Sequence, residues 1–272
     1  MEPILTKNTR ESEYTFRRLT RNRFLMFLIA WGCAIFIWML ISALTQLPAF
    51  ILPKPADVWH KLIDVLKNGV LWRNFSYTFL EVVLGLLLGS LLATLLAYWL
   101  SHKPVAERLL SPFLVGSQSV PIVAVAPLLV IWLGPGLGTK IFICGLTVFF
   151  PILISTLVGF REVSRDLHEL MRALRASPHQ TLRYLEWPAA LPVILGGLRV
   201  GATLSVIGAI VGELVGSDQG LGFLINVGRG QYDTALVFVA VFTLILLATS
   251  LYGLILLLES KVLAWQTWRK EA

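Results

Sequence analysis

Long stretches without a charged residue constrain this chain more than any other feature. Residues 24–44 contain no Asp, Glu, Lys or Arg. At a rise of about 1.5 Å per residue, a helix of this length crosses a hydrocarbon layer about 30 Å thick. Only 14% of all residues are charged, against about a quarter in soluble domains. The sequence therefore predicts a chain embedded in a lipid bilayer.

Further apolar segments bring the expected number of spans to six. Lipid offers no hydrogen-bond partner to an open backbone, so each span should be a helix. The predicted fold class is an all-α, polytopic membrane protein with six transmembrane helices, forming one domain over residues 24–260. A short helix before the second span, with Trp59 at the headgroup level, is expected to lie flat on the outer surface. The later spans are residues 78–100, 110–133, 141–160, 193–215 and 235–258.

Basic residues gather on one side of these spans. By the positive-inside rule this side is cytoplasmic, as are both termini, the arm 1–23 and the tail 261–272. The sequence pI of 9.6 thus reflects topology, and no nucleic-acid partner is expected. The cytoplasmic set is Lys7, Arg10, Arg17, Arg18, Arg21, Arg23, Lys103, Arg108, Arg161, Arg165, Arg172, Arg175, Arg183, Lys261, Arg269 and Lys270. The outer set is Lys54, Lys61, Lys67, Arg73, Lys140 and Arg229.

The connection 161–192 has the pattern of two short amphipathic helices. Its first helix carries an apolar stripe at helical spacing and should stop at Ser177-Pro178, where a capping hydroxyl and a proline begin a second helix. The second helix should end before Trp187-Pro188. Exposed amphipathic helices are typical of a docking surface for a partner protein, and a solvated loop on the membrane is the alternative. The stripe consists of Leu167, Leu170, Met171 and Leu174.

The third span contains two prolines, Pro121 and Pro127. Each removes a backbone hydrogen bond and should kink the helix. The freed carbonyls must then be buried in protein or face a wet cavity. The two prolines are therefore candidates for a translocation pathway, and a purely structural kink is the alternative.

The fifth span holds Glu213, the one acid that the sequence places deep in apolar surroundings. Acids inside the membrane usually face a cavity or a partner, and a carboxylate capped by backbone amides at the outer mouth is the alternative. Gly212 and Gly216 flank Glu213 and permit close helix packing. Glu213 and Gly216 join the pathway candidates. The glycine-rich exit after this span should form a re-entrant or tightly turned external segment.

No pattern in the sequence indicates enzyme chemistry. His60, His102, His168 and His179 are scattered and show no metal-ligand spacing. A Gly-x-Ser-x-Gly elbow and a phosphate-binding loop are absent too. The chain is not expected to be an enzyme or to bind a cofactor or metal. If transport is driven by ATP, another chain must hold the nucleotide.

Residues 169–188 resemble the signature of permease subunits of bacterial ATP-binding-cassette importers: Glu-Ala-Ala, three residues, Gly, nine residues, Ile-x-Leu-Pro. Glu169 falls on the Glu, Leu185 on the Ile and Trp187-Pro188 on the Leu-Pro. Leu170 and Met171 replace the alanines, and Arg175 replaces the glycine. The missing glycine argues against the usual tight turn after the first helix, and Ser177-Pro178 can supply the break instead.

The resemblance extends over nearly the whole chain, to permeases for nitrate, taurine, aliphatic sulfonates and vitamin precursors. It implies the type I importer fold, a multi-pass location in the bacterial cell membrane and a homodimer. It also implies an external solute-binding protein and two cytosolic ATPases, which bind the ATP and Mg²⁺. The resemblance assigns ATPase coupling to Leu167, Glu169, Leu170, Met171, Leu174 and Arg175.

The riboflavin and hydroxymethylpyrimidine branch is the most similar within that family. The candidate cavity stretch has no cation to hold a sulfonate or nitrate, which agrees with this branch. Import of an aliphatic sulfonate, taurine or nitrate is the alternative. Two alternatives from other classes are a secondary transporter that uses Glu213 as a proton site and a membrane-embedded enzyme or assembly scaffold, the latter disfavoured because the sequence shows no catalytic set.

Overall fold

The computed structural model describes residues 23–45 and 48–265, and over these residues every regular element is helical. The predictions for most of the basic arm, residues 1–22, lie outside the described residues. The same holds for the end of the tail, with Arg269 and Lys270.

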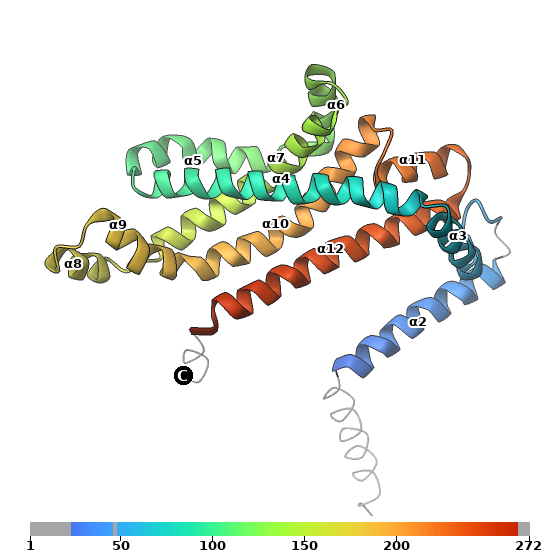
Figure 1. Cartoon of the computed structure of the whole chain (residues 1–272), viewed down its shortest axis with the longest axis horizontal. Helices are drawn as coiled ribbons and strands as arrows, with labels where there is room; N and C mark the ends of the chain where they lie inside the picture. Colours follow the sequence, from blue (N-terminus) through green and yellow to red (C-terminus); the bar gives the residue numbers. More distant parts are fainter. Residues whose placement is uncertain (1–22, 46–47, 266–272) are drawn as a thin grey trace, which may run out of the picture.

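Three long helices form the centre of the bundle: α4 (Val70–Ser101), α7 (Leu137–Arg161) and α10 (Trp187–Gly216). α7 lies between the other two (Figure 1). A side chain at Gly89 of α4 would come within 2.6 Å of the Gly145 carbonyl oxygen of α7. A side chain at Gly208 of α10 would meet the Cys144 backbone at 2.8 Å. Small residues therefore let these helices approach closely, as they do in membrane bundles.

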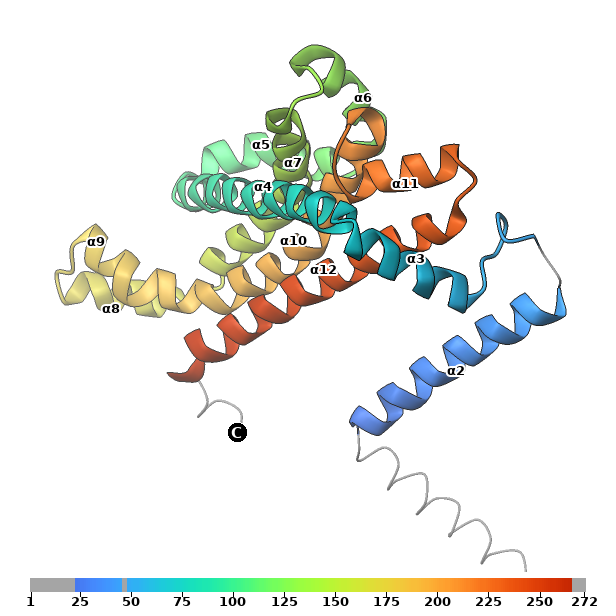
Figure 2. The ribbon, with the colours of Figure 1, turned by 45° about the vertical axis from the view of Figure 1, so that its right-hand side comes forward.

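The remaining helices cover this centre. α12 (Thr234–Val262) packs along α10, and α11 (Leu221–Gly230) packs on α12. α3 (Pro55–Lys67) joins them at the same end, with Val58 and Val65 buried and Lys61 paired to Asp233 at 2.7 Å. α2 (Arg23–Leu44) lies to the side of the bundle in Figure 2 and contacts it through Trp38, whose ring stacks on Phe238 of α12 with centroids 5.2 Å apart.

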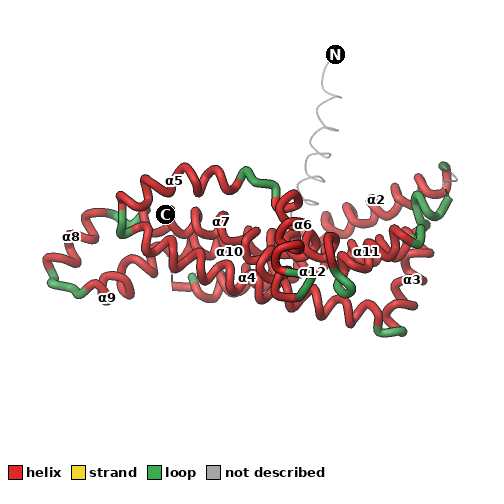
Figure 3. The backbone as a smooth tube through the Cα atoms, turned by 90° about the horizontal axis from the view of Figure 1, so that it is seen from above, coloured by secondary structure: helices red, strands yellow, loops and turns green. Residues whose placement is uncertain are grey.

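The bundle has two distinct ends. The short helices α8 (Arg165–Ala173) and α9 (Pro178–Thr181) lie at one end, and α3 and α11 lie at the other (Figure 3). We refer to them as the α8 end and the α11 end.

The described residues contain four helices that are long and apolar enough to cross a membrane. A fifth span results if the bent pair α5 (Pro104–Gln118) and α6 (Ile122–Leu133) crosses as one unit. Within α2, Ile29–Leu44 is a shorter apolar helix. The all-helical, multi-pass class is therefore confirmed, while the count of six spans and the cytoplasmic termini stay predictions.

The third span is broken, so the prediction of one kinked helix is wrong. α5 and α6 meet at an angle of 97°. Pro121 caps α6 in an extended conformation (φ −69°, ψ 110°), whereas Pro127 lies inside α6. A proline disfavours helical geometry in the residue before it and cannot donate a backbone hydrogen bond. Helix α5 therefore ends just before Pro121 and a new helix starts beyond it.

The tight turn after α8 is kept although glycine is absent, so the expectation that the missing glycine removes this turn is wrong. Arg175 adopts a left-handed conformation (φ +53°). Its N–H donates to the Arg172 oxygen at 2.9 Å, and the Ala176 N–H donates to the Met171 oxygen at 3.0 Å. These two bonds form a Schellman motif, which closes the end of a helix. The arginine therefore occupies the position where glycine is usual.

The restart at Ser177 is confirmed, and the end before Trp187-Pro188 is wrong. Ser177 and Gln180 form a reciprocal capping box at the start of α9. The helix then continues through a π-helical turn, Leu182–Glu186, directly into α10. In this turn the Trp187 N–H donates to the Leu182 oxygen, five residues back. The wider turn admits Pro188, which has no N–H, without stopping the helix.

Candidate functional site

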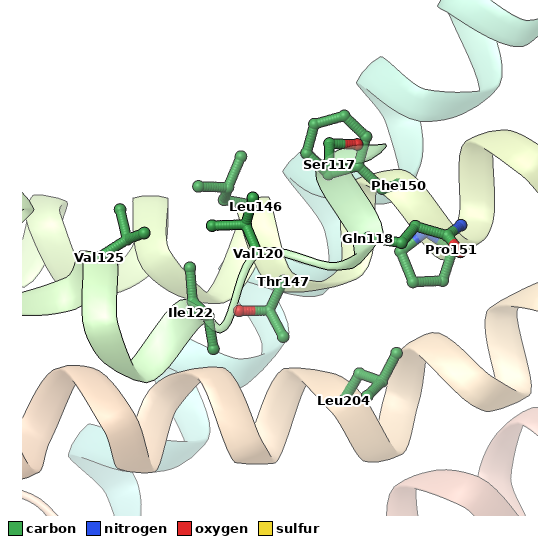
Figure 4. Close-up of a pocket in the computed structure, with 10 residues that line it drawn as sticks. All are labelled: Ser117, Gln118, Val120, Ile122, Val125, Leu146, Thr147, Phe150, Pro151 and Leu204. Atoms are coloured by element: carbon green, nitrogen blue, oxygen red, sulfur yellow. The ribbon is translucent and has the colours of Figure 1, made fainter. Parts of the chain in front are cut away.

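A cavity of about 430 Å³ opens beside the break between α5 and α6 (Figure 4). Val120 and Ile122, on either side of Pro121, line it, together with residues of α7 and α10. Pro121, one of the predicted pathway residues, thus adjoins this cavity, and its pathway role stays a prediction. Pro127 is exposed and is not among the lining residues. The lining is Ser117, Gln118, Val120, Ile122, Val125, Leu146, Thr147, Phe150, Pro151 and Leu204.

The chemistry of this cavity is neutral. No lining residue carries a charge, and most are apolar. Ser117 donates its hydroxyl to the Leu114 carbonyl oxygen at 2.8 Å, and Thr147 donates to the Ile143 oxygen at 2.7 Å. Both hydroxyl oxygens can still accept a hydrogen bond, and Gln118 adds an amide that both donates and accepts. Such a surface suits an uncharged solute with apolar and polar edges.

Glu213 does not face this cavity. Its side chain is fully buried and accepts from the Thr78 hydroxyl at 2.6 Å and the Gly222 N–H at 2.5 Å. Gly222 lies in the first turn of α11, where free backbone N–H groups favour a carboxylate. Gly220, with φ +109°, turns the chain so that this helix end meets Glu213. In the single chain, Glu213 is therefore a carboxylate capped by a backbone amide, which is the alternative to a pathway role. A pathway role for Glu213 stays a prediction.

Two charged residues that lie near Glu213 were not among the candidate site residues predicted from the sequence. Glu81 of α4 is fully buried, and Lys140 of α7 is 2% exposed. The Lys140 Nζ lies 3.7 Å from Glu81 Oε1 and 2.5 Å from Ser217 Oγ. Lys140, a member of the predicted outer set, is thus buried at the α11 end, and its side of the membrane stays a prediction. The signal for Glu81 was present, because it lies inside the predicted second span and an acid there is a site candidate.

A second cavity, of about 560 Å³, lies at the α11 end beside this cluster. It contains the predicted pathway residue Gly216, together with Lys140 and Tyr77, whose ring centroid is 5.4 Å from the Lys140 Nζ. The four pathway candidates therefore do not meet in one place. Pro121 adjoins the first cavity, Gly216 lines the second, Glu213 is buried and Pro127 lies outside both.

The predicted coupling residues lie on α8 and in the turn that follows it. Leu167, Leu170 and Leu174 are 44%, 53% and 69% exposed, although they are apolar. Met171 is half-buried, and Glu169 and Arg175 are exposed. An apolar stripe at the tip of the α8 end is therefore open to a partner.

The base of this loop contains a contact that the sequence did not indicate. His102, just after α4, and His168 of α8 both reach Glu186 in the π-helical turn. Glu186 was missed because it falls on the unspecified position of the Ile-x-Leu-Pro signature, and the two histidines are far apart in sequence. No group of His, Cys, Asp and Glu residues suited to a metal ion occurs in the part of the chain that the structure describes.

Residues 82–264 match the protein family described as binding-protein-dependent transport system inner membrane component. The riboflavin transport system permease protein RibX of Chloroflexus aurantiacus is 45% identical, over 84% of this chain and 85% of the relative. The formylaminopyrimidine transport permease protein ThiX of Halalkalibacterium halodurans is 33% identical, over 89% and 94%. A putative aliphatic sulfonates transport permease, SsuC of Bacillus subtilis, is 32% identical, over 85% and 83%.

A solved structure shares the fold. The inward-facing MetNI methionine ABC transporter contains a chain that matches with a TM-score of 0.54 at 23% identity, over 74% of this chain and 96% of that chain. The closely packed apolar helices, the exposed loop at the α8 end and the family match agree with one another. The chain belongs to the binding-protein-dependent transport system inner membrane components, the permease subunits of ABC transporters, and is a multi-pass protein of the cell membrane.

Proposed function

We propose that this permease imports a vitamin or vitamin precursor, either riboflavin or hydroxymethylpyrimidine. The cavity beside Pro121 is the observation that carries the proposal, because no charged side chain lines it. Both solutes are uncharged heteroaromatic molecules, and the Phe150 ring could pack against such a face. The relatives RibX and ThiX support the same class.

An aliphatic sulfonate, taurine or nitrate is the second candidate, favoured by the relatives SsuC and TauC. Aliphatic sulfonates and taurine carry an anionic sulfonate group, and nitrate is itself an anion. Removing such a group from water without a charged partner is unfavourable. The uncharged lining therefore argues for the vitamin class.

Uptake into proteoliposomes tests the substrate. The permease is reconstituted with its ATPase and binding protein, and labelled riboflavin, hydroxymethylpyrimidine and taurine are compared. Thr147→Val should reduce vitamin uptake, because it removes a hydroxyl from the cavity. Thr243→Val is the matched control, since this hydroxyl also donates to its own helix at 2.7 Å but lies on α12. Uptake of taurine alone would contradict the proposal.

The pathway is tested separately. Single cysteines placed along residues 120–130 should react with a water-soluble reagent, and the reactivity should change with the nucleotide bound to the ATPase. Positions that stay unreactive in every nucleotide state would show that the α5–α6 break does not line the route.

The complex is proposed to be a homodimer of the permease with two ATPases. Each ATPase binds the loop 161–192 of one permease on the cytoplasmic side. The ATPases supply the ATP and Mg²⁺ sites, and an external protein delivers the solute. Mass measurement of the detergent-purified complex should give a permease:ATPase ratio of 1:1, and any other ratio contradicts this arrangement.

The stripe on α8 is proposed to fill an apolar groove on the ATPase. Truncating a buried interface anchor typically costs about 2 kcal/mol or more. Leu170→Asp should abolish co-purification of the ATPase, because it places an unpaired charge in that groove. Glu169→Ala should leave a weaker complex that hydrolyses ATP with poor coupling to uptake. Undiminished ATPase binding by Leu170→Asp would show that α8 is not the docking site.

A further inference from the structure

Two tryptophans of α4 mark the levels at which this helix leaves the hydrocarbon. α4 has 32 residues and is about 48 Å long, which exceeds the hydrocarbon thickness of about 30 Å. Trp72 and Trp99 lie in its first and last turns, and their side chains are 70% and 49% exposed. They are about 40 Å apart along the helix axis, close to the thickness of a bilayer with its headgroups. Tryptophan is enriched at the headgroup level, so Trp99 places the end of α4 among lipid headgroups.

A hollow of about 350 Å³ opens at this level, where the chain turns from α4 into α5. Figure 1 shows this turn at the α8 end, with α5 running back along α4. Apart from one lysine, the residues that line the hollow are apolar. They are Trp99, Lys103, Pro104, Val105, Ala106 and Leu109.

An apolar stripe on α5 continues from this hollow. Val105, Leu109 and Phe113 follow one another at four-residue spacing and so share one face of the helix. Their side chains are 72%, 67% and 73% exposed. Because α5 runs back along α4, the stripe leads from the headgroup level toward the interior of the membrane. The hollow and the stripe together have the shape of a track for a hydrocarbon chain.

Two cations at this hollow lack a partner. Lys103 and Arg108 are exposed, and neither forms an ion pair with any residue that the structure describes. The acid in the first turn of α5, Glu107, is buried and already paired with Arg161 of α7. Two positive charges therefore stay uncompensated at the headgroup level, beside an apolar surface. A phosphate group complements them.

We propose that this hollow binds one anionic phospholipid. Its phosphate contacts Lys103 and Arg108, and one acyl chain lies along Val105 and Leu109. A soluble anion would leave the apolar wall in water, and a zwitterionic lipid would leave the positive charge uncompensated. A two-fold interface between copies of the chain, centred here, would bring four cations together and is disfavoured. The site is separate from the cavity beside Pro121 and does not depend on which solute is transported.

Native mass spectrometry of the detergent-purified permease–ATPase complex tests the headgroup contact. Phosphatidylglycerol and phosphatidylcholine with identical acyl chains are titrated in, and phosphatidylglycerol should bind more tightly. Lys103→Gln and Arg108→Gln should each weaken its binding by about fivefold and leave phosphatidylcholine unaffected. Lys67→Gln and Arg73→Gln are the matched controls, because these exposed cations lie near Trp72 at the α11 end and do not line the hollow. Each control should change binding by less than about twofold.

A second pair of variants tests the acyl-chain contact. Leu109→Asn should weaken phosphatidylglycerol binding several-fold, because it replaces an apolar wall by an amide. Leu257→Asn on α12 is the matched control, since Leu257 is 62% exposed and lies outside the hollow. Glycerol 3-phosphate, which has the phosphate without acyl chains, should not compete. The changed side chains in both experiments are exposed, so the packing of the helices is kept.

Four results would overturn the proposal. The first is equal binding of the two lipids, and the second is unchanged binding in both Lys103→Gln and Arg108→Gln. Competition by glycerol 3-phosphate would show a site for soluble anions. Efficient disulfide formation between two copies of Leu109→Cys, in a chain with Cys33 and Cys144 replaced by alanine, would show that a second copy covers the hollow.

Discussion

The two ends of the bundle each hold a buried glutamate in contact with basic side chains, but they isolate it from water to different degrees. At the α11 end, Glu81 and Lys140 are 0% and 2% exposed, and the Lys140 Nζ lies 3.7 Å from Glu81 Oε1. At the α8 end, the Glu186 side chain is 8% exposed, while His102 and His168 are 45% and 31% exposed. A pair sealed from water is costly to break, because removing one partner leaves the other buried without compensation. A pair that water reaches is screened by solvent and salt and contributes less.

The largest expected effect follows from removing the sealed cation at the α11 end. Lys140→Met leaves Glu81 and Glu213 buried without their cation, and breaking a buried pair costs about 3–5 kcal/mol. Lys61→Met is the matched control, because its pair with Asp233 is 31% and 23% exposed and such pairs contribute about 1 kcal/mol or less. Thermal unfolding of the detergent-purified protein measures both. Equal losses would show that the α11-end cluster is not sealed.

A smaller difference is expected between the two glutamates of that cluster. Glu213 accepts from an N–H and a hydroxyl, whereas neither oxygen of Glu81 has a hydrogen-bond partner over the described residues. Hydrogen bonds to a charged group contribute about 1.5–3 kcal/mol. Glu213→Gln should therefore lower the unfolding temperature more than Glu81→Gln. If Glu81→Gln is the more harmful, Glu81 has a partner that the single chain lacks.

The smallest effect compares two left-handed residues, one at each end. Arg175 (φ +53°) ends α8, and Tyr232 (φ +56°) ends α11 with the same pair of backbone bonds. Relieving the left-handed conformation of a non-glycine residue should stabilise by about 1 kcal/mol. Arg175→Gly should gain this amount, measured as slower hydrogen exchange at the Ala176 amide.

Tyr232→Gly should gain less, because its ring contacts Phe50 with centroids 6.3 Å apart and that contact is lost. The corresponding amide there is that of Asp233, which donates to the Gly228 oxygen at 2.8 Å. A greater gain from Tyr232→Gly than from Arg175→Gly would show that the Phe50 contact does not offset the strain at Tyr232, and no gain from Arg175→Gly would show that its left-handed conformation is not strained.

Local patterns predicted much of the fold and the loop. The restart at Ser177-Pro178 depends on a hydroxyl, a proline and Gln180, all within one turn of helix. Prolines were harder to interpret. Pro112 and Pro127 lie inside helices, while Pro121 ends one and starts the next. The local chemistry of the three is the same, so the packing of neighbouring helices decides which one becomes the break.

The sequence alone determined that this chain is helical and membrane-embedded, because an uncharged stretch in lipid has no other way to satisfy its backbone. It also determined the position of the exposed amphipathic loop, because an apolar stripe on a charged segment depends only on helical periodicity. Only the tertiary structure decided which charges meet. Thr78 and Glu213 are 135 residues apart, and His102 and Glu186 are 84 apart. Such pairs depend on how the helices pack against one another, and no local pattern in the chain specifies that packing.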